Sequence, residues 1–381
     1  MTGKIVLFMA DLVVPGGAER VCVEEASYLQ KKGIDVTILT FNLNERALYD
    51  HKELKIEIVK GILGLRKKLK SIKPDLIIAQ SYWDCSYVYL ATLLTNLRYA
   101  THIHATMFWM QDPRIYSFIH SGVFDEIRNS VAGHQEFIPE NPKFSIIKKI
   151  KLNLMAILDY YAVRKAKKIF TMTGHMAWEI KKLYGKNAIT NPGAISSELL
   201  DYKPNQDIKK KLGLEGKRIL LNINRLDKRK RVDKLIEAFS RIEEKDTVLV
   251  IGGTGEEKDN LVKLAKDLGV DDRVIFVGFI PESELWDYHM ACEVFVHPNW
   301  TDFVLSPYEA LALQRKVVWS TEMDSHEYIK TNEHVFATEP TVEGIKEAIE
   351  KALNTKMVRN IDMSYYVWDK YFKKIYNRIK K

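Results

Sequence analysis

The segment VFVHPNWTDFVLSPYE, residues 294–309, carries the signals that decide the expected fold. Its apolar start, Val294–Val296, is typical of a buried strand, and Pro298 ends that strand. Its last four residues fit a capping box, with Ser306 as the N-cap and Glu309 in the first turn of a new helix. Such a strand, turn and helix start favour an anionic ligand, because backbone N–H groups at a helix N-terminus lack partners. Glu309 has an alternative use, since the cap alone would satisfy its carboxylate.

The same alternation of strand and helix extends from this segment toward both ends of the chain. Short apolar runs predict strands over residues 5–10, 36–40, 75–80, 101–104, 169–173, 218–222, 247–251, 273–277, 293–296 and 316–320. Apolar residues at helical spacing predict helices over residues 18–32, 176–184, 232–242 and 260–268. This order of elements is typical of parallel, doubly wound α/β sheets.

The length of 381 residues suits two domains rather than one. We expect residues 1–195 and 196–364 to form them, because residues from about 196 to 207 have the composition of a linker. Residues 365–381 are expected to be an amphipathic helix that needs a surface to cover; its apolar stripe consists of Trp368, Phe372, Ile375 and Ile379.

The formal net charge of +8 favours an anionic partner: a sugar nucleotide, a lipid phosphate, a membrane surface or a nucleic acid. A solvated Lys-rich surface explains the same charge without any partner. The three cysteines, Cys22, Cys85 and Cys292, are scattered without metal-ligand spacing, which indicates a reducing compartment. No apolar run approaches the roughly 20 residues that a membrane-spanning helix needs, and Ile5–Ala10 is interpreted as a first strand rather than a targeting segment.

Residues 105–161 depart from the strand–helix alternation and form an aromatic and basic insert. The stretch from Lys143 to Lys168 holds eight basic residues and one acid, Asp159. Its apolar residues recur on one helical face: Ile147, Ile150, Leu154, Leu158 and Tyr161. A basic amphipathic helix of this kind can lie on an anionic membrane, or it can pack on its own domain with a solvated basic face.

Loops that follow predicted strands carry groups suited to an anionic ligand. Paired glycines such as Gly16 and Gly17 let backbone N–H groups approach a phosphate, although Gly-Gly is also a plain turn. In the run Asn224–Arg231, Arg225 and Lys230 are candidates to neutralise a diphosphate, and the other basic residues are interpreted as a solvated face.

Two further strand ends carry candidate residues. Gly252–Gly255 is no dinucleotide fingerprint, since its third glycine is absent, and it can be a tight strand-to-helix turn. His102 and His104 face the same side of their strand by alternation. A lone histidine is usually structural, but the position of His104 at the strand end favours a functional role.

Taken together, these features resemble the retaining glycosyltransferases of family 4, which have the two-Rossmann-domain (GT-B) architecture. The resemblance covers nearly the whole chain and is strongest from Arg218 to Ile329. Gly16–Arg20 is similar to that family's N-terminal glycine loop, especially in mannosyltransferases acting on lipid-linked oligosaccharides. Asn224–Lys230 resembles its Gly-Arg-Leu-x-x-x-x-Lys segment, with Asn224 in place of the first glycine and Arg231 in place of the glycine after the lysine.

The resemblance implies an α/β fold of two Rossmann-like domains facing each other across a cleft, with the C-terminal helix crossing back to the N-terminal, acceptor-side domain. It also implies roles for the matched residues. Arg225 and Lys230 would hold the donor diphosphate, and His104 would lie beside the donor sugar. Glu309 would hydrogen-bond the ribose. Other positions would contact the substrate: Gly16, Gly17, Gly253, Gly255, Gly278, Phe279, Ile280, Phe303, Val304 and Leu305.

The chain departs from the family at the first glutamate of its Glu-x7-Glu motif. Counting back eight residues from Glu309 gives Thr301, and the nearest carboxylate is Asp302. Three interpretations follow: Asp302 substitutes after a small backbone shift, the donor sugar is held differently, or activity is weak or lost. The third would make the chain a non-catalytic partner that binds sugar nucleotides or glycans.

The function implied by the resemblance is transfer of a hexose from a UDP- or GDP-linked donor to an acceptor hydroxyl with retention of configuration. Neither a metal nor another cofactor is implied, because positive side chains and helix N-termini carry the leaving diphosphate. The aromatic and basic insert favours a lipid-linked or membrane-surface glycoconjugate as acceptor. The protein is thus expected in the cytoplasm, peripheral on an anionic membrane. Nucleic-acid binding is not expected, since no recognisable module is present.

Overall fold

The structure is a computed structural model. It describes residues 3–14, 16–49, 51, 53–104, 145–191, 194–299, 304–322, 329, 331–356 and 361–379, and the side chains of all of these except Lys149 and Leu152. The described chain divides into two compact units. The first comprises the residues up to Asn191 together with Trp368–Ile379, and the second comprises Ala194–Val367. The chain therefore passes between the units close to the expected boundaries at 195/196 and 364/365.

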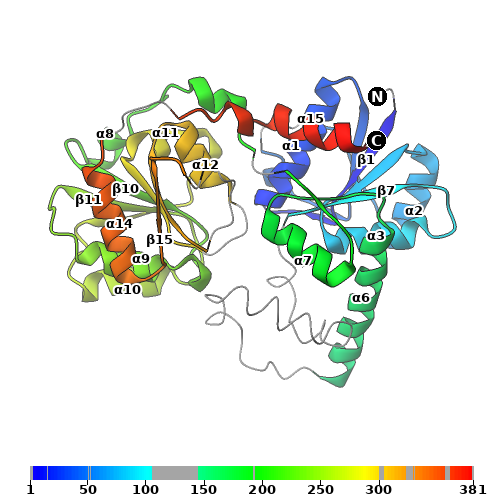
Figure 1. The fold of residues 1–381 in the computed structure, drawn as a ribbon, viewed down its shortest axis with the longest axis horizontal. Helices are drawn as coiled ribbons and strands as arrows, with labels where there is room; N and C mark the ends of the chain where they lie inside the picture. The colour runs from blue at the N-terminus through cyan, green and yellow to red at the C-terminus, as the bar shows by residue number, and fades with distance from the viewer. Residues whose placement is uncertain are drawn as a thin grey trace. The chain divides into compact units, whose positions relative to one another are not determined.

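The first unit is built on a parallel seven-stranded sheet with strand order β5-β3-β1-β6-β7-β8-β9 (Figure 1). Its strands are β1 Lys4–Phe8, β3 Asp35–Thr40, β5 Ile56–Ile58, β6 Leu76–Ala79, β7 Tyr99–Ile103, β8 Ile169–Thr171 and β9 Ile189–Thr190. Its helices are α1 Gly17–Lys31, α2 Gly61–Ile72, α3 Tyr82–Thr92, α6 Ile146–Lys165, α7 Gly174–Tyr184 and α15 Trp368–Ile379. A short parallel pair, β2 Asp11–Leu12 and β4 Asn42–Leu43, and the 3-10 turn η1 Glu45–Leu48 lie beyond the ends of β1 and β3.

The second unit repeats this architecture with a parallel six-stranded sheet in the order β12-β11-β10-β13-β14-β15. Its strands are β10 Arg218–Ile223, β11 Thr247–Gly252, β12 Val274–Gly278, β13 Val294–His297, β14 Lys316–Ser320 and β15 Val335–Thr338. Its helices are α8 Ile208–Leu212, α9 Val232–Ser240, α10 Lys258–Asp267, α11 Glu282–Ala291, α12 Leu305–Ala312 and α14 Val342–Asn354, with 3-10 turns η3 Ser197–Asp201, η4 Lys228–Lys230 and η5 Ser364–Tyr366.

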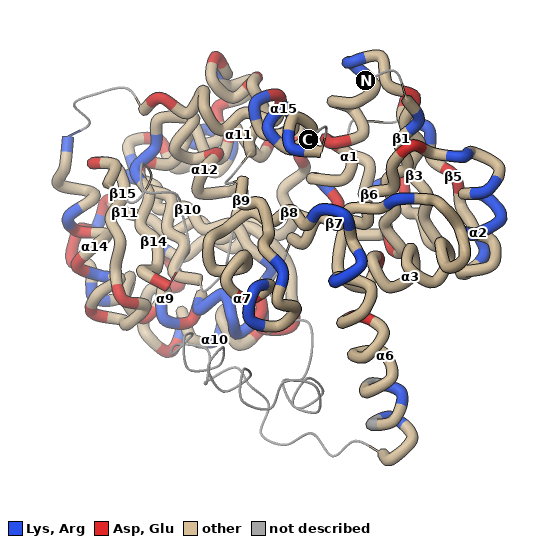
Figure 2. Tube along the Cα trace, turned by 45° about the vertical axis from the view of Figure 1, so that its right-hand side comes forward, with Lys and Arg blue, Asp and Glu red and all other residues tan. Residues whose placement is uncertain are grey.

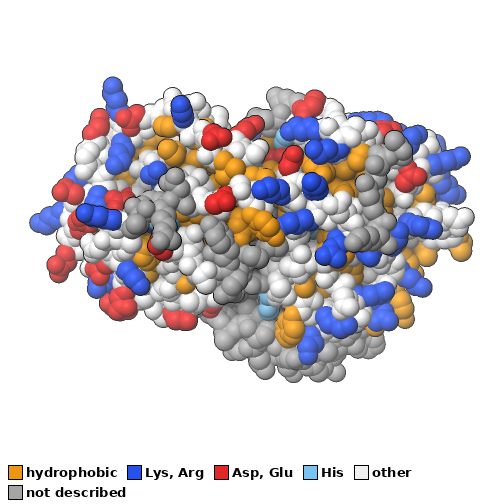
Figure 3. Space-filling model, turned by 45° about the horizontal axis from the view of Figure 1, so that its top comes forward, with side chains coloured by type: hydrophobic (Ala, Val, Ile, Leu, Met, Phe, Trp, Pro, Cys, Tyr) orange, Lys and Arg blue, Asp and Glu red, His pale blue; other side chains and the backbone are white. Residues whose placement is uncertain are grey.

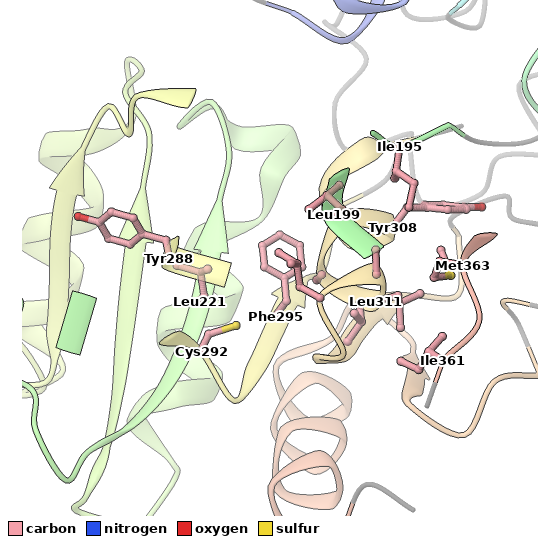
Figure 4. Packing of buried hydrophobic residues seen from close by; sticks show 14 of the residues in the cluster. Ile195, Leu199, Leu221, Tyr288, Cys292, Phe295, Tyr308, Leu311, Ile361 and Met363 are labelled. Carbon is pink, nitrogen blue, oxygen red and sulfur yellow. The ribbon is translucent and has the colours of Figure 1, made fainter. Parts of the chain in front are cut away.

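Alternation along the strands divides the apolar core of the second unit into two layers. On β10, Leu221 packs with Phe295 in a cluster that takes in α11 and α12, whereas its neighbour Leu220 packs on the opposite layer with α9, α10 and α14. Figure 4 shows the first cluster, in which Leu221, Phe295 and Leu311 point into one apolar interior. Helices on both faces explain why these strands read as continuous apolar runs.

The last helix, α15, belongs to the first unit although the second unit precedes it in sequence. The predicted stripe is confirmed as buried: Trp368, Phe372, Ile375 and Ile379 are at most 6% exposed. Phe372 lies against Tyr28 of α1, with ring centroids 5.5 Å apart, and Figure 1 shows α15 running beside α1. The surface that this amphipathic helix covers is therefore α1.

The predicted capping box at Ser306 is wrong. Helix α12 begins at Leu305, with Val304 as its N-cap and no side-chain cap. Ser306 is thus the second helical residue and Glu309 the fifth, two positions too late for the reciprocal bonds of a capping box. The pattern misled because Pro307 fits the first turn of a helix at several positions and does not specify one of them.

Several elements fall outside the predicted set. Helix α3 consists almost wholly of apolar and aromatic residues, so its sequence has no polar face to reveal helical spacing. No prediction covered α2, β5, β15 or α14. The predicted linker contains η3, whose Leu199 is buried in the second unit. Of the expected insert 105–161, residues 105–144 lie outside the described residues. The whole of α6 lies within the basic stretch from Lys143 to Lys168.

Truncation of Phe372 to alanine should destabilise the first unit by about 3 to 5 kcal/mol, because Phe372 is fully buried and its removal leaves a cavity. Urea denaturation followed by tryptophan fluorescence measures this loss, with Trp368 stacked on Phe372 at 5.4 Å as a nearby reporter. The control Lys373→Ala removes an exposed side chain of the same helix and should change stability by less than about 0.5 kcal/mol. Equal effects of the two substitutions would contradict the packing described for α15.

Candidate functional sites

In the second unit, loops at the carboxyl ends of β10, β11 and β12 are joined by main-chain hydrogen bonds. The N–H of Asn224 donates to the carbonyl of Gly252 at 3.1 Å, and that of Leu226 donates to Thr254 at 2.9 Å. The N–H of Gly253 donates to Gly278 at 2.6 Å. Because parallel strands end at one edge of the sheet, these bonds build a single connected surface from three loops.

Two predicted substrate-binding glycines have a packing reason in this surface. Gly253 has φ +120°, and a Cβ there would lie 1.7 Å from the carbonyl oxygen of Asn224. A Cβ on Gly255 would lie 2.2 Å from the carbonyl oxygen of Leu226. Only glycine allows the β10 and β11 loops to approach this closely. These two glycines are therefore explained by contact between the two loops, and this explanation does not depend on the ligand.

Charge neutralisation separates the basic residues that follow β10 into two groups. Arg229 pairs with Asp227 at 2.9 Å. Arg231 is buried and pairs with Glu322 at 2.7 Å, and it also donates to the carbonyl of Pro298. Arg231 adopts φ +48°, a left-handed conformation that favours glycine, and the family pattern has glycine at this position.

Arg225, Lys228 and Lys230 form the second group, and within the described residues none of them forms an ion pair. Arg225 is exposed and Lys230 is half-buried. Burial lowers the pKa of the Lys230 ammonium to about 8, and the positive charges of Arg229 and Arg225 act in the same direction. An anion that binds beside such a side chain stabilises its charged form.

A ladder of three asparagines ties this loop to the end of β13. Asn299 donates to Asn224 at 2.9 Å, Asn224 donates to Asn222 at 3.1 Å, and Asn222 donates to the carbonyl of Val296 at 2.7 Å. Asn224 stands where the resembled family has glycine, so this departure gains a structural role. Sequence reasoning missed the ladder because Asn299 lies 75 residues from Asn224 in the chain.

His297, at the end of β13, is a further residue that sequence reasoning missed. It is fully buried, and its ring nitrogens have no hydrogen-bond partner within the described residues. Burial and the charge of Lys230 hold its pKa well below the usual range, so the ring is neutral.

The remaining candidates of the second unit lie around the β12 and β13 ends. Phe279 is 65% exposed, and Gly278 before it has φ +72°. Ile280 is buried, and a Cβ on Gly252 would collide with its side chain. Glu309 is 2% exposed in α12, preceded by Val304 and Leu305 at the helix start. Asp302, with Thr301 and Phe303, lies outside the described residues.

The first unit presents its own candidates at the carboxyl ends of β1, β6 and β7, which are neighbours in the sheet. Gly16 is the N-cap of α1, and Gly17 is its first residue. The carbonyl of Gly16 accepts a hydrogen bond from the Tyr49 hydroxyl at 2.7 Å, which anchors the loop. His104 follows β7, and its Nε2 lies 2.9 Å from Oε1 of Gln80 at the end of β6.

His104 is neutral in this environment. Burial, reinforced by neighbouring His102, holds its pKa well below the usual range. The predicted orientation of the two histidines is confirmed, since their ring centroids are 4.2 Å apart. Gln80 and the buried Glu25 behind it were not predicted, because nothing local in the sequence marks them. Among the described residues, no cluster of His, Cys, Asp or Glu is arranged to hold a metal ion.

Comparison with known proteins gives two family matches, one on each unit. The model described as Glycosyltransferase Family 4 matches residues 15–191, and the model described as Glycosyl transferases group 1 matches residues 204–366. The two matches together run through nearly all of the strands described above.

Individual relatives and solved structures agree with these matches. An uncharacterized glycosyltransferase of Haemophilus influenzae is 25% identical over 83% of this chain and 80% of its own length. A GDP-mannose-dependent α-(1-6)-phosphatidylinositol monomannoside mannosyltransferase of Mycolicibacterium smegmatis is 34% identical over 24% of either chain. The structure of sucrose-phosphate synthase from Thermosynechococcus elongatus aligns with TM-score 0.77 at 16% identity over 99% of both chains. That of Anabaena HepE in complex with UDP and glucose aligns with TM-score 0.74 at 16% identity over 100% of both; these structures show the shared fold.

Because the pKa of Lys230 is about 8, this lysine is largely uncharged above that pH. We therefore predict that Lys230 takes up a proton when a nucleoside diphosphate binds at a pH above about 8. The bound anion favours the ammonium form, so the pKa of Lys230 rises in the complex and affinity falls as the pH increases through 8. Isothermal titration calorimetry of UDP and GDP, in buffers of different ionisation enthalpy, measures this uptake. The variant Lys230→Met should bind more weakly without uptake, whereas Lys228→Met, an exposed lysine of the same turn, should retain it. Undiminished uptake by Lys230→Met would contradict the assignment.

Proposed function

The chain belongs to the family 4 glycosyltransferases, with two parallel-sheet α/β domains of the GT-B type, and we propose that it transfers a hexose from a nucleotide-sugar to an acceptor hydroxyl with retention of configuration. The observation that carries the proposal is the pair Arg225 and Lys230, two cations without ion-pair partners in the described chain. They stand where strand-end loops of a parallel sheet bind phosphates. UDP occupies the similarly folded HepE, and the mannosyltransferase relative uses GDP-mannose.

In the proposed mechanism, Arg225 binds the donor diphosphate through its guanidinium fork and Lys230 supplies a point charge. As the bond from the anomeric carbon to the phosphate oxygen breaks, these charges stabilise the leaving diphosphate without requiring a metal ion. The acceptor hydroxyl attacks from the same face, and its proton passes to the departing phosphate oxygen. One bond to the anomeric carbon is exchanged for another, and configuration is retained.

The nucleoside has a proposed place at the ends of β12 and β13. Phe279 is exposed, which suits stacking against a base. We propose that Glu309 hydrogen-bonds the ribose and that His104 of the first unit contacts a hydroxyl of the sugar substrate. We further propose that Asp302 and Phe303 contact the donor sugar.

Helix α6 supports a lipid-linked or membrane-surface acceptor. Five large apolar side chains on it are more than half exposed: Ile146, Ile147, Ile150, Leu154 and Tyr161. Its one acid, Asp159, is buried and accepts a hydrogen bond from Tyr184, which leaves Lys148, Lys151, Arg164 and Lys165 as its described ionic groups in contact with solvent. Figure 2 shows this helix with its basic residues. Exposed apolar residues beside exposed basic side chains suit the interface of an anionic membrane.

The surface charge of the first unit points in the same direction. On the face shown in Figure 3, the right-hand part carries many Lys and Arg side chains with few acidic ones between them.

None of the described helices is long and apolar enough to cross a bilayer. All three cysteines are buried and unpaired, which suits the reducing cytoplasm. We therefore propose peripheral association with the cytoplasmic face of a membrane.

Arg225→Ala should lower kcat/KM for sugar transfer by at least about 100-fold while leaving the fold intact, because an exposed side chain that stabilises the leaving group is removed. A thermal-shift screen of UDP-, GDP- and ADP-sugars first identifies the donor through ligand-linked stabilisation. The matched control is Arg229→Ala, whose guanidinium is held by Asp227 and should not be needed for transfer. Full turnover by Arg225→Ala would refute the diphosphate site. Donor binding by the unaltered protein without transfer or hydrolysis would instead favour a non-catalytic binding partner.

The α6 assignment predicts binding to vesicles of phosphatidylglycerol mixed with phosphatidylcholine and little binding to phosphatidylcholine alone, as measured by flotation. Ile147→Ser with Leu154→Ser should weaken binding by at least about tenfold, because each loses apolar surface that enters the membrane. The control is Leu63→Ser on α2, an apolar residue of the same unit that is 82% exposed. Equal weakening by both changes, or binding indifferent to lipid charge, would exclude α6 as the membrane contact.

A further inference from the structure

A chain of hydrogen bonds leads from the last helix of the protein to His104. The Tyr376 hydroxyl of α15 donates to Oε1 of Glu25 at 2.8 Å. The Gln80 amide nitrogen donates to the other oxygen of Glu25 at 2.7 Å, and Gln80 Oε1 lies 2.9 Å from Nε2 of His104. Glu25 and Gln80 are 0% exposed, and Tyr376 is 5% exposed. Side chains from α15, α1, β6 and β7 are therefore joined in one buried line.

The chemistry of the donors and acceptors sets the direction of this line. The Glu25 carboxylate can only accept, so the NH₂ group of Gln80 must face it. The carbonyl oxygen of Gln80 then faces His104 and can only accept as well. Nε2 of His104 must carry the hydrogen that fills this contact. Since a neutral imidazole has one N–H, Nδ1 of His104 is left with a lone pair.

His102 shows that the local environment does not impose one tautomer on both rings. Its Nε2 lies 2.7 Å from the Tyr371 hydroxyl, and its Nδ1 faces Glu25 at 3.9 Å. These neighbours favour hydrogen on Nδ1 and a lone pair on Nε2, the reverse of His104. The distinction between the two histidines therefore comes from Gln80, which contacts His104.

Nδ1 of His104 is buried, and it has no hydrogen-bond partner among the described residues. We propose that Gln80, held by Glu25 and Tyr376, is a positioning residue that fixes the tautomer of His104 so that Nδ1 accepts a hydrogen bond from a hydroxyl group of the sugar substrate. A lone pair at this point attracts a hydroxyl and repels a phosphate oxygen. The inference rests on the proposed transferase function only for the identity of the hydroxyl, since the tautomer is a property of the protein alone.

The tautomer can be read without any substrate. Nitrogen-15 NMR of the labelled protein should show His104 as a neutral ring with hydrogen on Nε2 at neutral pH. In Gln80→Met, which keeps the side-chain length but removes both hydrogen bonds, both neutral tautomers should be populated. The control Tyr371→Phe removes a hydroxyl of the same helix that serves His102, and it should leave His104 unchanged. If Gln80→Met fails to fold, Gln80→Leu removes the same two hydrogen bonds with a branched apolar side chain and should likewise populate both neutral tautomers.

The functional consequence is tested with monodeoxy donor sugars. With the unaltered protein, one deoxy analogue should react more slowly than the parent sugar. Gln80→Met should lower kcat/KM for the parent sugar about tenfold, because one hydrogen bond to a buried group is lost. For that analogue the same substitution should have no effect, since the hydroxyl is already missing. A purely structural role would slow all sugars equally and would overturn the proposal.

The NMR experiment tests the tautomer of His104, and the transfer assay tests the proposed function, so the two proposals can be refuted separately. Hydrogen on Nδ1 of His104, a charged ring at neutral pH, or an unchanged tautomer in Gln80→Met would overturn the inference while leaving the transferase proposal intact. Absence of transfer by the unaltered protein would overturn the proposed function and the role of the hydroxyl, but it would leave the assigned tautomer standing.

Discussion

Parallel pairing of strands is the constraint on which both candidate sites depend. In each sheet every strand runs the same way, so the carboxyl ends of neighbouring strands meet at one edge. That edge gathers Gly16, Gln80 and His104 in the first unit and Arg225 with His297 in the second. Residues more than 60 positions apart in the chain become neighbours there without any sequence signal linking them, since the sheet register decides which loops meet.

Buried polar groups at these edges are compensated by partners from distant parts of the chain. Glu25 accepts from Gln80 and Tyr376, and Arg231 is neutralised by Glu322. A buried charge without such partners would cost several kcal/mol. The groups at these edges that lack partners among the described residues include Lys230, both ring nitrogens of His297 and Nδ1 of His104. They are informative, because a bound ligand would supply what the protein does not.

Local patterns predicted the fold well where apolar periodicity was strong. The strands ending at Ile223 and Gly252 were expected within a residue or so, and the stripe of α15 was recognised as a buried face. Local patterns failed in α3, where too few polar residues reveal the helical spacing. They also failed at Ser306, where the sequence is compatible with several helix start positions. Candidate site residues came from the resemblance to a family, and a family motif does not include supporting residues such as Gln80 and Asn299.

By itself, the sequence determined the two-domain α/β architecture, the positions of most strands and the basic character of the chain, because these depend on local periodicity, length and composition. Only the tertiary structure decided which cations are already neutralised, why Gly253 must be glycine, and which nitrogen of His104 carries hydrogen. Each of these depends on distances between segments that are remote in sequence. Hydrogen bonds and desolvation act over a few ångströms of space, and no local pattern encodes those separations.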